Sequence, residues 1–129
     1  MSLQTHLRID RKLCGDLVEL VPGYAKVRLL TTSQMLADEE GLVHGGFTFG
    51  AADFAAMAAI NDPYVVLVAA QVEFLAPVVV GDEVVFEARV MKKDGKKGEV
   101  HVSAKVGEKE VFRGIFQTYS PTKHILRRD

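Results

Sequence analysis

Residues 41–62 read GLVHGGFTFGAADFAAMAAIND, and this stretch decides the fold. It opens with His44-Gly45-Gly46 and continues as a run of small and apolar residues in which Asp53 is the only charge before the last position. The alanines favour helix over strand, and a residue before proline avoids helical backbone. We therefore expect one long helix that starts near Phe47, after the glycines, and ends at Asn61-Asp62-Pro63.

The segments around this stretch predict a sheet. Residues 17–21 and 24–30 form a hairpin across the turn signal Pro22-Gly23. Apolar residues then recur with a period of two in four further segments, at residues 64–74, 83–90, 99–106 and 111–119. The order of hairpin, helix and four strands predicts an α+β fold in which a curved antiparallel sheet of five to six strands wraps the long helix.

Two weaker sequence patterns add to this prediction. Leu3–Leu13 has roughly helical apolar spacing and predicts a short N-terminal helix. Residues 64–74 are apolar for most of their length, which predicts a strand covered on both faces.

Composition narrows the class of protein. A chain of 129 residues predicts one domain over residues 1–129. The net charge of −1 gives no electrostatic reason to expect nucleic acid or an anionic membrane as a partner. The apolar run of the helix is too short to span a bilayer. The single cysteine, Cys14, suits a reducing cytoplasm, and no Cys/His cluster suggests a metal.

Asp53 is the first candidate for chemistry. It lies two turns into the expected helix, and the residues one turn away (Phe49, Gly50, Ala56 and Met57) cannot pair with it. An unpaired carboxylate in apolar surroundings costs several kcal/mol or takes up a proton. It serves either as a base or nucleophile of raised pKa, or as a structural hydrogen-bond acceptor for a strand or a partner chain.

His44-Gly45-Gly46 is the second candidate. Amides bared by glycine at a helix start can hold an anion or a developing oxyanion, although such a triplet also suits a simple tight turn. Gly45 and Asp53 are eight residues apart, so within one helix they are on the order of 10–12 Å apart. A base must lie within about 3 Å of its target. One reaction using both groups therefore predicts a two-fold dimer with two shared sites.

The combination of His44-Gly45-Gly46, six intervening residues and Asp53, on an Ala-rich helix between a hairpin and a run of strands, resembles the hotdog-fold acyl-CoA thioesterases. The closest branch is that of the PaaI-type, phenylacetyl-CoA thioesterase-like proteins, and the resemblance covers residues 17–119. It implies a hydrolase that converts an acyl-CoA to a free acid and the CoA thiol. It also implies a cytoplasmic homodimer or homotetramer, and no cofactor, because CoA is part of the substrate.

The resemblance also implies roles for single residues. The N–H of Gly45 would polarise the thioester carbonyl, and Asp53 of the other subunit would act as general base or nucleophile. His44 would be a supporting group. Many relatives have Asn where this chain has Asp38, and an ionised Asp only accepts hydrogen bonds. The acyl group would lie against Gly46, Phe47, Phe54 and Met57.

Basic residues are candidates for the CoA phosphates, although a solvated hairpin turn is the favoured interpretation of the lysines. They are Lys92, Lys93, Lys96, Lys97, Arg127 and Arg128.

Two other functions remain open. A hotdog enoyl-CoA hydratase would need the pattern Asp-x-Asn-Pro-x-His, whereas position 39 is Glu and positions 41 and 42 are Gly and Leu. The other alternative is a non-catalytic acyl-CoA-binding or sensing protein, against which the presence of Asp53 argues.

Overall fold

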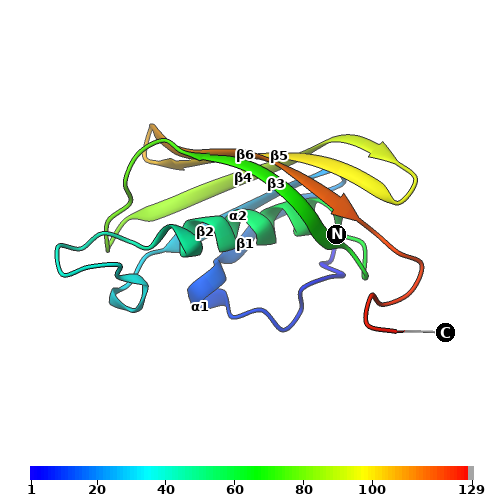
Figure 1. Ribbon diagram of the computed structural model, residues 1–129, viewed down its shortest axis with the longest axis horizontal. Coiled ribbons are helices and arrows are strands. Elements are labelled where there is room, and N and C mark those ends of the chain that lie inside the picture. Colours follow the sequence, from blue (N-terminus) through cyan, green and yellow to red (C-terminus); the bar gives the residue numbers. More distant parts are fainter. Residues whose placement is uncertain (128–129) are drawn as a thin grey trace.

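The computed structural model describes residues 1–127, and they form one six-stranded antiparallel sheet around a central helix (Figure 1). The strands follow the spatial order β1-β2-β4-β5-β6-β3. The elements along the chain are α1 (Arg11–Cys14), β1 (Asp16–Val21), β2 (Tyr24–Leu30), the 3₁₀ turn η1 (Ser33–Met35), α2 (Gly45–Ile60), β3 (Val66–Phe74), β4 (Glu83–Asp94), β5 (Lys97–Val106) and β6 (Lys109–Tyr119). The α+β architecture and the order of hairpin, helix and four strands are confirmed.

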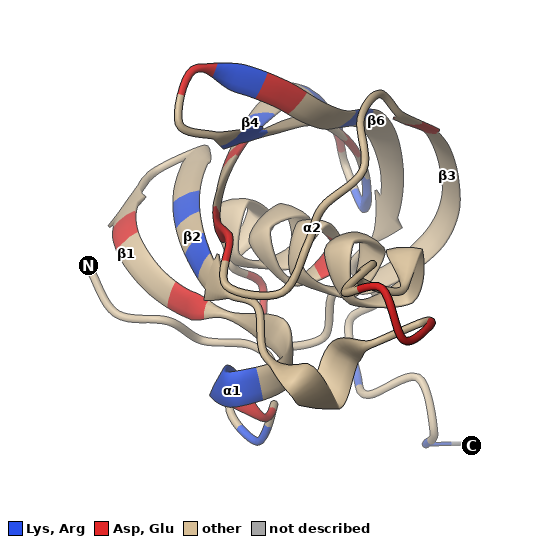
Figure 2. Ribbon diagram, turned by 90° about the vertical axis from the view of Figure 1, so that its left-hand side faces the viewer, with Lys and Arg blue, Asp and Glu red and all other residues tan. Residues whose placement is uncertain are grey.

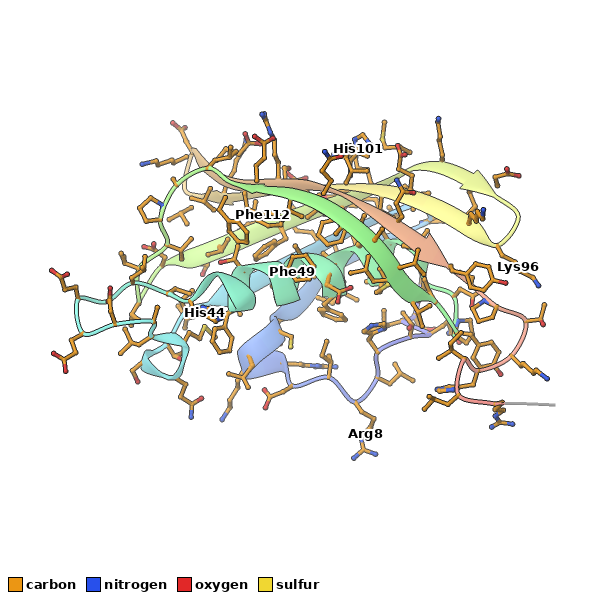
Figure 3. All side chains as sticks on the ribbon, viewed as in Figure 1. Arg8, His44, Phe49, Lys96, His101 and Phe112 are labelled. Atoms are coloured by element: carbon orange, nitrogen blue, oxygen red, sulfur yellow. The ribbon has the colours of Figure 1, made fainter. Side chains whose placement is uncertain are left out.

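Helix α2 is the core of the molecule. The sheet curls around it, and Asp53 is its only charged residue (Figure 2). Its buried residues are Thr48, Ala51, Ala52, Phe54, Ala55, Ala56, Met57, Ala58 and Ala59, so it has no polar stripe of the kind that a surface helix shows. Phe49 and Phe112 lie between the helix and the sheet (Figure 3), with Phe49 packed on Phe116 at a ring distance of 5.6 Å.

Tight turns fix the register of the strands. Val21 pairs with Tyr24, Asp94 with Lys97, and Val106 with Lys109, so each hairpin has a two-residue loop. The positive φ angles of Gly23, Gly95 and Gly107 suit such loops.

The predicted helix over Leu3–Leu13 is wrong, because only Arg11–Cys14 is helical. Asp10 caps that turn by accepting hydrogen bonds from the N–H groups of Lys12 and Leu13. The residues before it form an irregular strap along α2. The N–H of Gln4 donates to Asn61 Oδ1 (2.7 Å), and Asn61 Nδ2 donates to the carbonyl of Ser2 (3.0 Å).

Two further expectations need correction. Helix α2 begins at Gly45 and not near Phe47, because the first amides of a helix have no partner within it and glycines are tolerated there. Strand β3 begins at Val66 and is an edge strand, and the exposure of its side chains shows that it is not covered on both faces. Val68 is 61% exposed and Phe74 is 55% exposed.

The packing of β5 gives a test of this fold. A side chain at Gly98 would place Cβ 2.5 Å from Thr118 Oγ1 and 2.8 Å from Ile60 Cδ1, at the end of α2. We expect Gly98→Ala to lower the free energy of unfolding by about 1–3 kcal/mol in a denaturant titration, because the core must move to accept it. Lys105→Ala, on the exposed side of β5, is the control. An unchanged midpoint for Gly98→Ala would contradict the packing.

Candidate active site

Asp53 has the environment of a reactive carboxylate. Its side chain is half-buried, and Oδ1 has almost no exposed surface and no hydrogen-bond partner in the described chain. Burial is the cause that raises the pKa of Asp53 to about 6. A carboxylate with a pKa near the working pH can take and return a proton, as general acid–base chemistry requires.

The short helix α1 packs beside this carboxylate. Burial raises the pKa of the Cys14 thiol, and the negative charges of Asp10 and Asp53 raise it further. Cys14 therefore lies within electrostatic range of Asp53, a proximity that 38 intervening residues hid in the sequence. For Asp53 itself, burial alone is the cause that favours the protonated form.

The start of α2 presents its amides as donors. His44 has extended backbone (φ −63°, ψ 130°) and Gly45 is the first helical residue. The first amides of a helix lack intrahelical acceptors and lie at the positive end of its dipole. The ring of His44 lies over Gly46, because a Cβ built on Gly46 would be 2.9 Å from His44 Nε2. The same ring packs edge-on against Phe47, with the ring centroids 6.1 Å apart. Glycine at position 46 thus makes room for the exposed imidazole.

Asp38 has a local structural role. Its Oδ1 accepts hydrogen bonds from the N–H groups of Glu40 (2.9 Å) and Leu42 (3.2 Å), which hold the turn that leads into the helix. The side chain is exposed. A part in positioning water or substrate stays a prediction.

The four predicted acyl-binding residues do not lie together. Gly46 is exposed at the helix start, and Phe47 is partly buried beside it. Phe54 is buried, with its ring 6.4 Å from that of His6 under the N-terminal strap, and Met57 is completely buried. Phe54 and Met57 thus offer a substrate little surface within one chain, and their binding role stays a prediction.

An apolar cavity of about 360 Å³ opens beside Gly45 instead. Its lining comes from the start of α2, the turn before it and the end of β3 with the segment that follows; the residues are Leu42, Val43, Gly45, Thr48, Phe74, Leu75, Ala76, Pro77, Val78 and Val111. No sequence pattern predicted this cavity. Phe74, at the end of β3, is a large aromatic residue that could have hinted at an apolar site. Only the fold, however, brings Phe74 next to Gly45.

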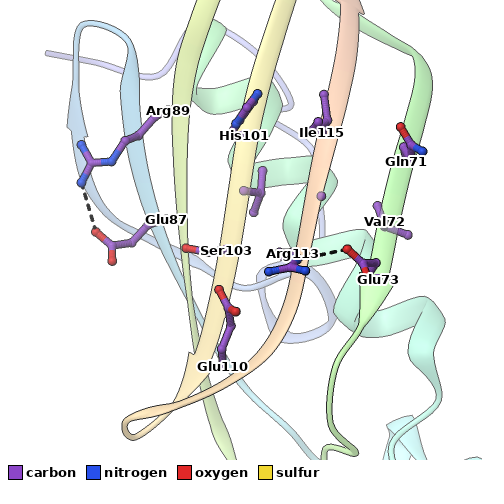
Figure 4. Close-up of a pocket in the computed structure, with 12 residues that line it drawn as sticks. Gln71, Val72, Glu73, Glu87, Arg89, His101, Ser103, Glu110, Arg113 and Ile115 are labelled. Carbon is purple, nitrogen blue, oxygen red and sulfur yellow. Dashed lines mark hydrogen bonds and ion pairs between the residues drawn. The ribbon is translucent and has the colours of Figure 1, made fainter.

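A larger hollow of about 680 Å³ lies on the opposite face of the sheet (Figure 4). Four of its charged side chains form two ion pairs: Arg113 Nε lies 3.1 Å from Glu73 Oε1, and Arg89 lies 3.7 Å from Glu87. His101 points away from α2 on this face (Figure 3). The sheet separates this hollow from Asp53, so the two do not form one site.

The hairpin between β4 and β5 carries Lys92, Lys93, Lys96 and Lys97. It lies at the far end of α2 from His44, as the position of Lys96 shows (Figure 3). Gly98, next to the hairpin, packs on Ile60 at the end of α2, and Lys93 Nζ donates to the carbonyl of Gly95 (2.7 Å). Within one chain these lysines are remote from Gly45. Arg127 is exposed, and Arg128 lies outside the described residues.

Gly45 and Asp53 lie on the same unbroken helix, eight residues apart. Their separation is therefore about 12 Å, and one chain does not bring them to one carbonyl. Across residues 1–127, no group of three His, Cys, Asp or Glu side chains is placed to hold a metal ion. The same residues include no helix with the length and apolar character needed to cross a membrane.

Two curated proteins are similar to this chain over only part of their own length. The methylthioribose-1-phosphate isomerase of Aquifex aeolicus is 52% identical over 118 residues, which cover 92% of this chain and 26% of that protein. Transcription factor FapR of Caldanaerobacter subterraneus is 33% identical over 121 residues, which cover 93% of this chain and 60% of that protein. The chain thus spans about a quarter and three fifths of these relatives.

Solved structures match most of the chain. An uncharacterised protein from Pyrococcus horikoshii is 46% identical, with a TM-score of 0.97 and 98% of each chain covered. The E. coli PaaI protein from the phenylacetic acid degradation operon is 26% identical, with a TM-score of 0.80, over 87% of this chain and 83% of that chain.

The family model of the thioesterase superfamily matches residues 40–112, which include the whole of α2, strands β3 to β5 and the start of β6. This match covers more than half of the chain. Together with the six-stranded sheet wrapped around one helix, it shows that the chain is a hotdog-fold protein and belongs to the thioesterase superfamily.

Proposed function

We propose that the protein hydrolyses an acyl-CoA thioester to a free acid and the CoA thiol. The observation that carries this proposal is Asp53, a carboxylate with one buried, unpartnered oxygen and a pKa of about 6 on the helix whose first amides are free to bind an oxyanion. Membership of the thioesterase superfamily supports the reaction type.

In the proposed reaction the thioester carbonyl oxygen accepts a hydrogen bond from the Gly45 N–H. Asp53 of the other subunit takes a proton from water, and the resulting hydroxide attacks the carbonyl carbon. The tetrahedral oxyanion is stabilised by the same amide and by the helix dipole. Collapse breaks the C–S bond, and the leaving thiolate receives the proton from Asp53. The alternative is direct attack by the carboxylate on the carbonyl carbon, which breaks the C–S bond, releases the CoA thiolate to take a proton from solvent, and forms an anhydride that water then hydrolyses.

The proposed dimer follows from the distance along α2 and from the open edge of the sheet. Strand β3 leaves one row of backbone donors and acceptors unpaired, and its exposed apolar side chains include Val68 and Phe74. Such an edge favours pairing with another strand. Edge-to-edge pairing of two β3 strands would make a homodimer with a continuous sheet, and two such dimers would make a homotetramer.

Single substitutions at the two ends of the proposed site should separate chemistry from folding. We expect Asp53→Asn to reduce thiol release from acyl-CoA by at least about a hundredfold, because the amide cannot take a proton. Gly45→Pro should act similarly, because proline removes the N–H yet suits the first helical position, and the extended backbone of His44 suits a residue before proline.

Gly45→Ala is the matched control, since it adds Cβ beside Phe74 and keeps the N–H. Circular dichroism and gel filtration would verify that the variants fold and assemble. Unchanged turnover in folded Asp53→Asn would exclude Asp53 from catalysis.

Mixing the two inactive variants tests whether the sites are shared. A dimer of one Asp53→Asn chain and one Gly45→Pro chain holds one intact site if each site uses both subunits. Random re-association of equal amounts should therefore restore about a quarter of the wild-type activity, since half of the dimers are mixed and each has one of two sites. No recovery in verified mixed dimers would show that each chain forms its site alone.

The raised pKa of Asp53 makes stability depend on pH. The unfolded chain releases this proton near pH 4 and the folded protein near pH 6. The free energy of unfolding should therefore fall as the pH rises from about 4 to about 6, and stay lowered above that. Asp53→Asn should remove this fall and raise the melting temperature at pH 7. The exposed Asp94→Asn is the control and should keep the wild-type slope; the same slope in Asp53→Asn would contradict the pKa.

A second candidate is an acyl-CoA-binding module without turnover. The 33% identity to a part of FapR supports only the absence of turnover, since that protein is named as a transcription factor and not as an enzyme. Incubation with an acyl-CoA panel and a thiol reagent distinguishes the two, since binding detected by calorimetry without release of thiol would support the module. A hydratase would instead convert an enoyl-CoA and release no thiol.

A further inference from the structure

We propose that the cavity beside Gly45 receives the acyl group and selects compact, uncharged apolar acyl chains over acyl chains that end in a carboxylate. This inference rests on the proposed function, because it takes the Gly45 N–H as the point that holds the thioester carbonyl.

The position of the cavity supports this assignment. Gly45 is itself part of the lining, and a Cβ built on it would lie 3.2 Å from Cε1 of Phe74 on the other wall. Because Gly45 lines the cavity, an acyl group whose carbonyl oxygen is bound at the Gly45 N–H would lie next to the cavity. The inner end is closed by Thr48 and Val111, which are both buried.

The lining carries no charge. Its ten residues are apolar apart from the hydroxyl of Thr48, and none is Lys, Arg or His. A carboxylate moved into such a cavity would lose its hydration without gaining an ionic partner. In the proposed dimer, Asp53 of the other subunit would add a second negative charge at the same thioester. A butyryl group therefore fits this cavity, whereas a succinyl group of the same carbon number does not.

The size of the cavity limits the acyl group as well. Its volume of about 360 Å³ is near the lower end of the roughly 300–1,000 Å³ that small-molecule sites occupy. Phe74 and Ala76 stand on the wall formed by the end of β3 and the segment after it. Phe74 is an exposed part of that wall, with its ring 5.3 Å from that of Phe112, and Ala76 is the position where a larger side chain would fill the space.

The charge preference can be tested by adding one cation to the lining. The readout is the ratio of kcat/KM for succinyl-CoA to that for butyryl-CoA, in which effects on the shared CoA part cancel. Wild type should favour butyryl-CoA by at least tenfold. Leu42→Arg should raise the ratio for succinyl-CoA at least tenfold, because Leu42 lines the cavity and is 38% exposed.

Leu36→Arg is the matched control, since Leu36 is 42% exposed on the neighbouring segment and does not line the cavity. Its ratio should stay within about twofold of wild type. Equal use of both substrates by wild type, or an equal response of the two arginine variants, would overturn the proposal.

The size preference has its own pair of variants. Over butyryl-, hexanoyl- and decanoyl-CoA, Ala76→Leu should shift the preference to shorter chains and Phe74→Ala to longer chains. One methylene in an apolar pocket changes specificity by roughly 10- to 200-fold, so the shifts are measurable. An unchanged chain-length profile in both folded variants would show that the acyl group lies elsewhere.

The same panel as non-hydrolysable thioether analogues, measured by calorimetry, separates the two proposals. If no substrate releases thiol but binding follows the expected charge and length preferences, hydrolysis fails and the cavity assignment stands. If thiol is released without these preferences, hydrolysis stands and the cavity assignment fails.

Discussion

Burial of α2 inside the curled sheet is the contact on which the rest of the structure depends. The alanines on this helix let β2, β4 and β5 approach closely on one side, while the N-terminal strap and α1 cover another. Close packing of this kind leaves little room for change, because a few added atoms must displace the strands. It also fixes the direction of the helix, so that its first amides and Asp53 keep one set of positions relative to the sheet.

This packing explains how a destabilising residue can persist in the core element. Asp53 loses hydration without gaining a hydrogen bond at Oδ1, and nothing in the fold requires a carboxylate there. Surrounding apolar contacts supply the stability that such a group removes. The unfavourable desolvation is confined to Asp53, which is also the residue that acts as base or nucleophile in the proposed reaction.

The parts of the fold that follow local chemistry were predictable from sequence. The Pro22-Gly23 turn, the period of two in the strands and the end of α2 at Asn61 all depend on neighbours in the chain. The N-terminal strap was not predictable, because its apolar residues contact α2 across long sequence separations rather than forming turns among themselves. The same limit applied to the placement of β3 beside β6, since an apolar segment does not reveal which strand it will pair with.

At the candidate site, sequence patterns identified Asp53 and the glycine triplet because both conflict with the helix that contains them. They did not identify the cavity beside Gly45, because ordinary residues such as Leu42 and Phe74 acquire a shared surface only after folding. Nor did they indicate that Asp38 would hold its own turn, since a carboxylate before a loop can face either its own backbone or a ligand.

The exposed edge of β3 has a consequence for how the protein behaves on dilution. An edge that pairs between two chains ties part of the folding free energy to protein concentration, so melting temperature should rise as the solution becomes more concentrated. The separated chain would carry an open, apolar strand that can also pair with the wrong molecule. Assembly would then protect each chain from aggregation as well as complete its site, and both benefits would vanish together below the dissociation constant.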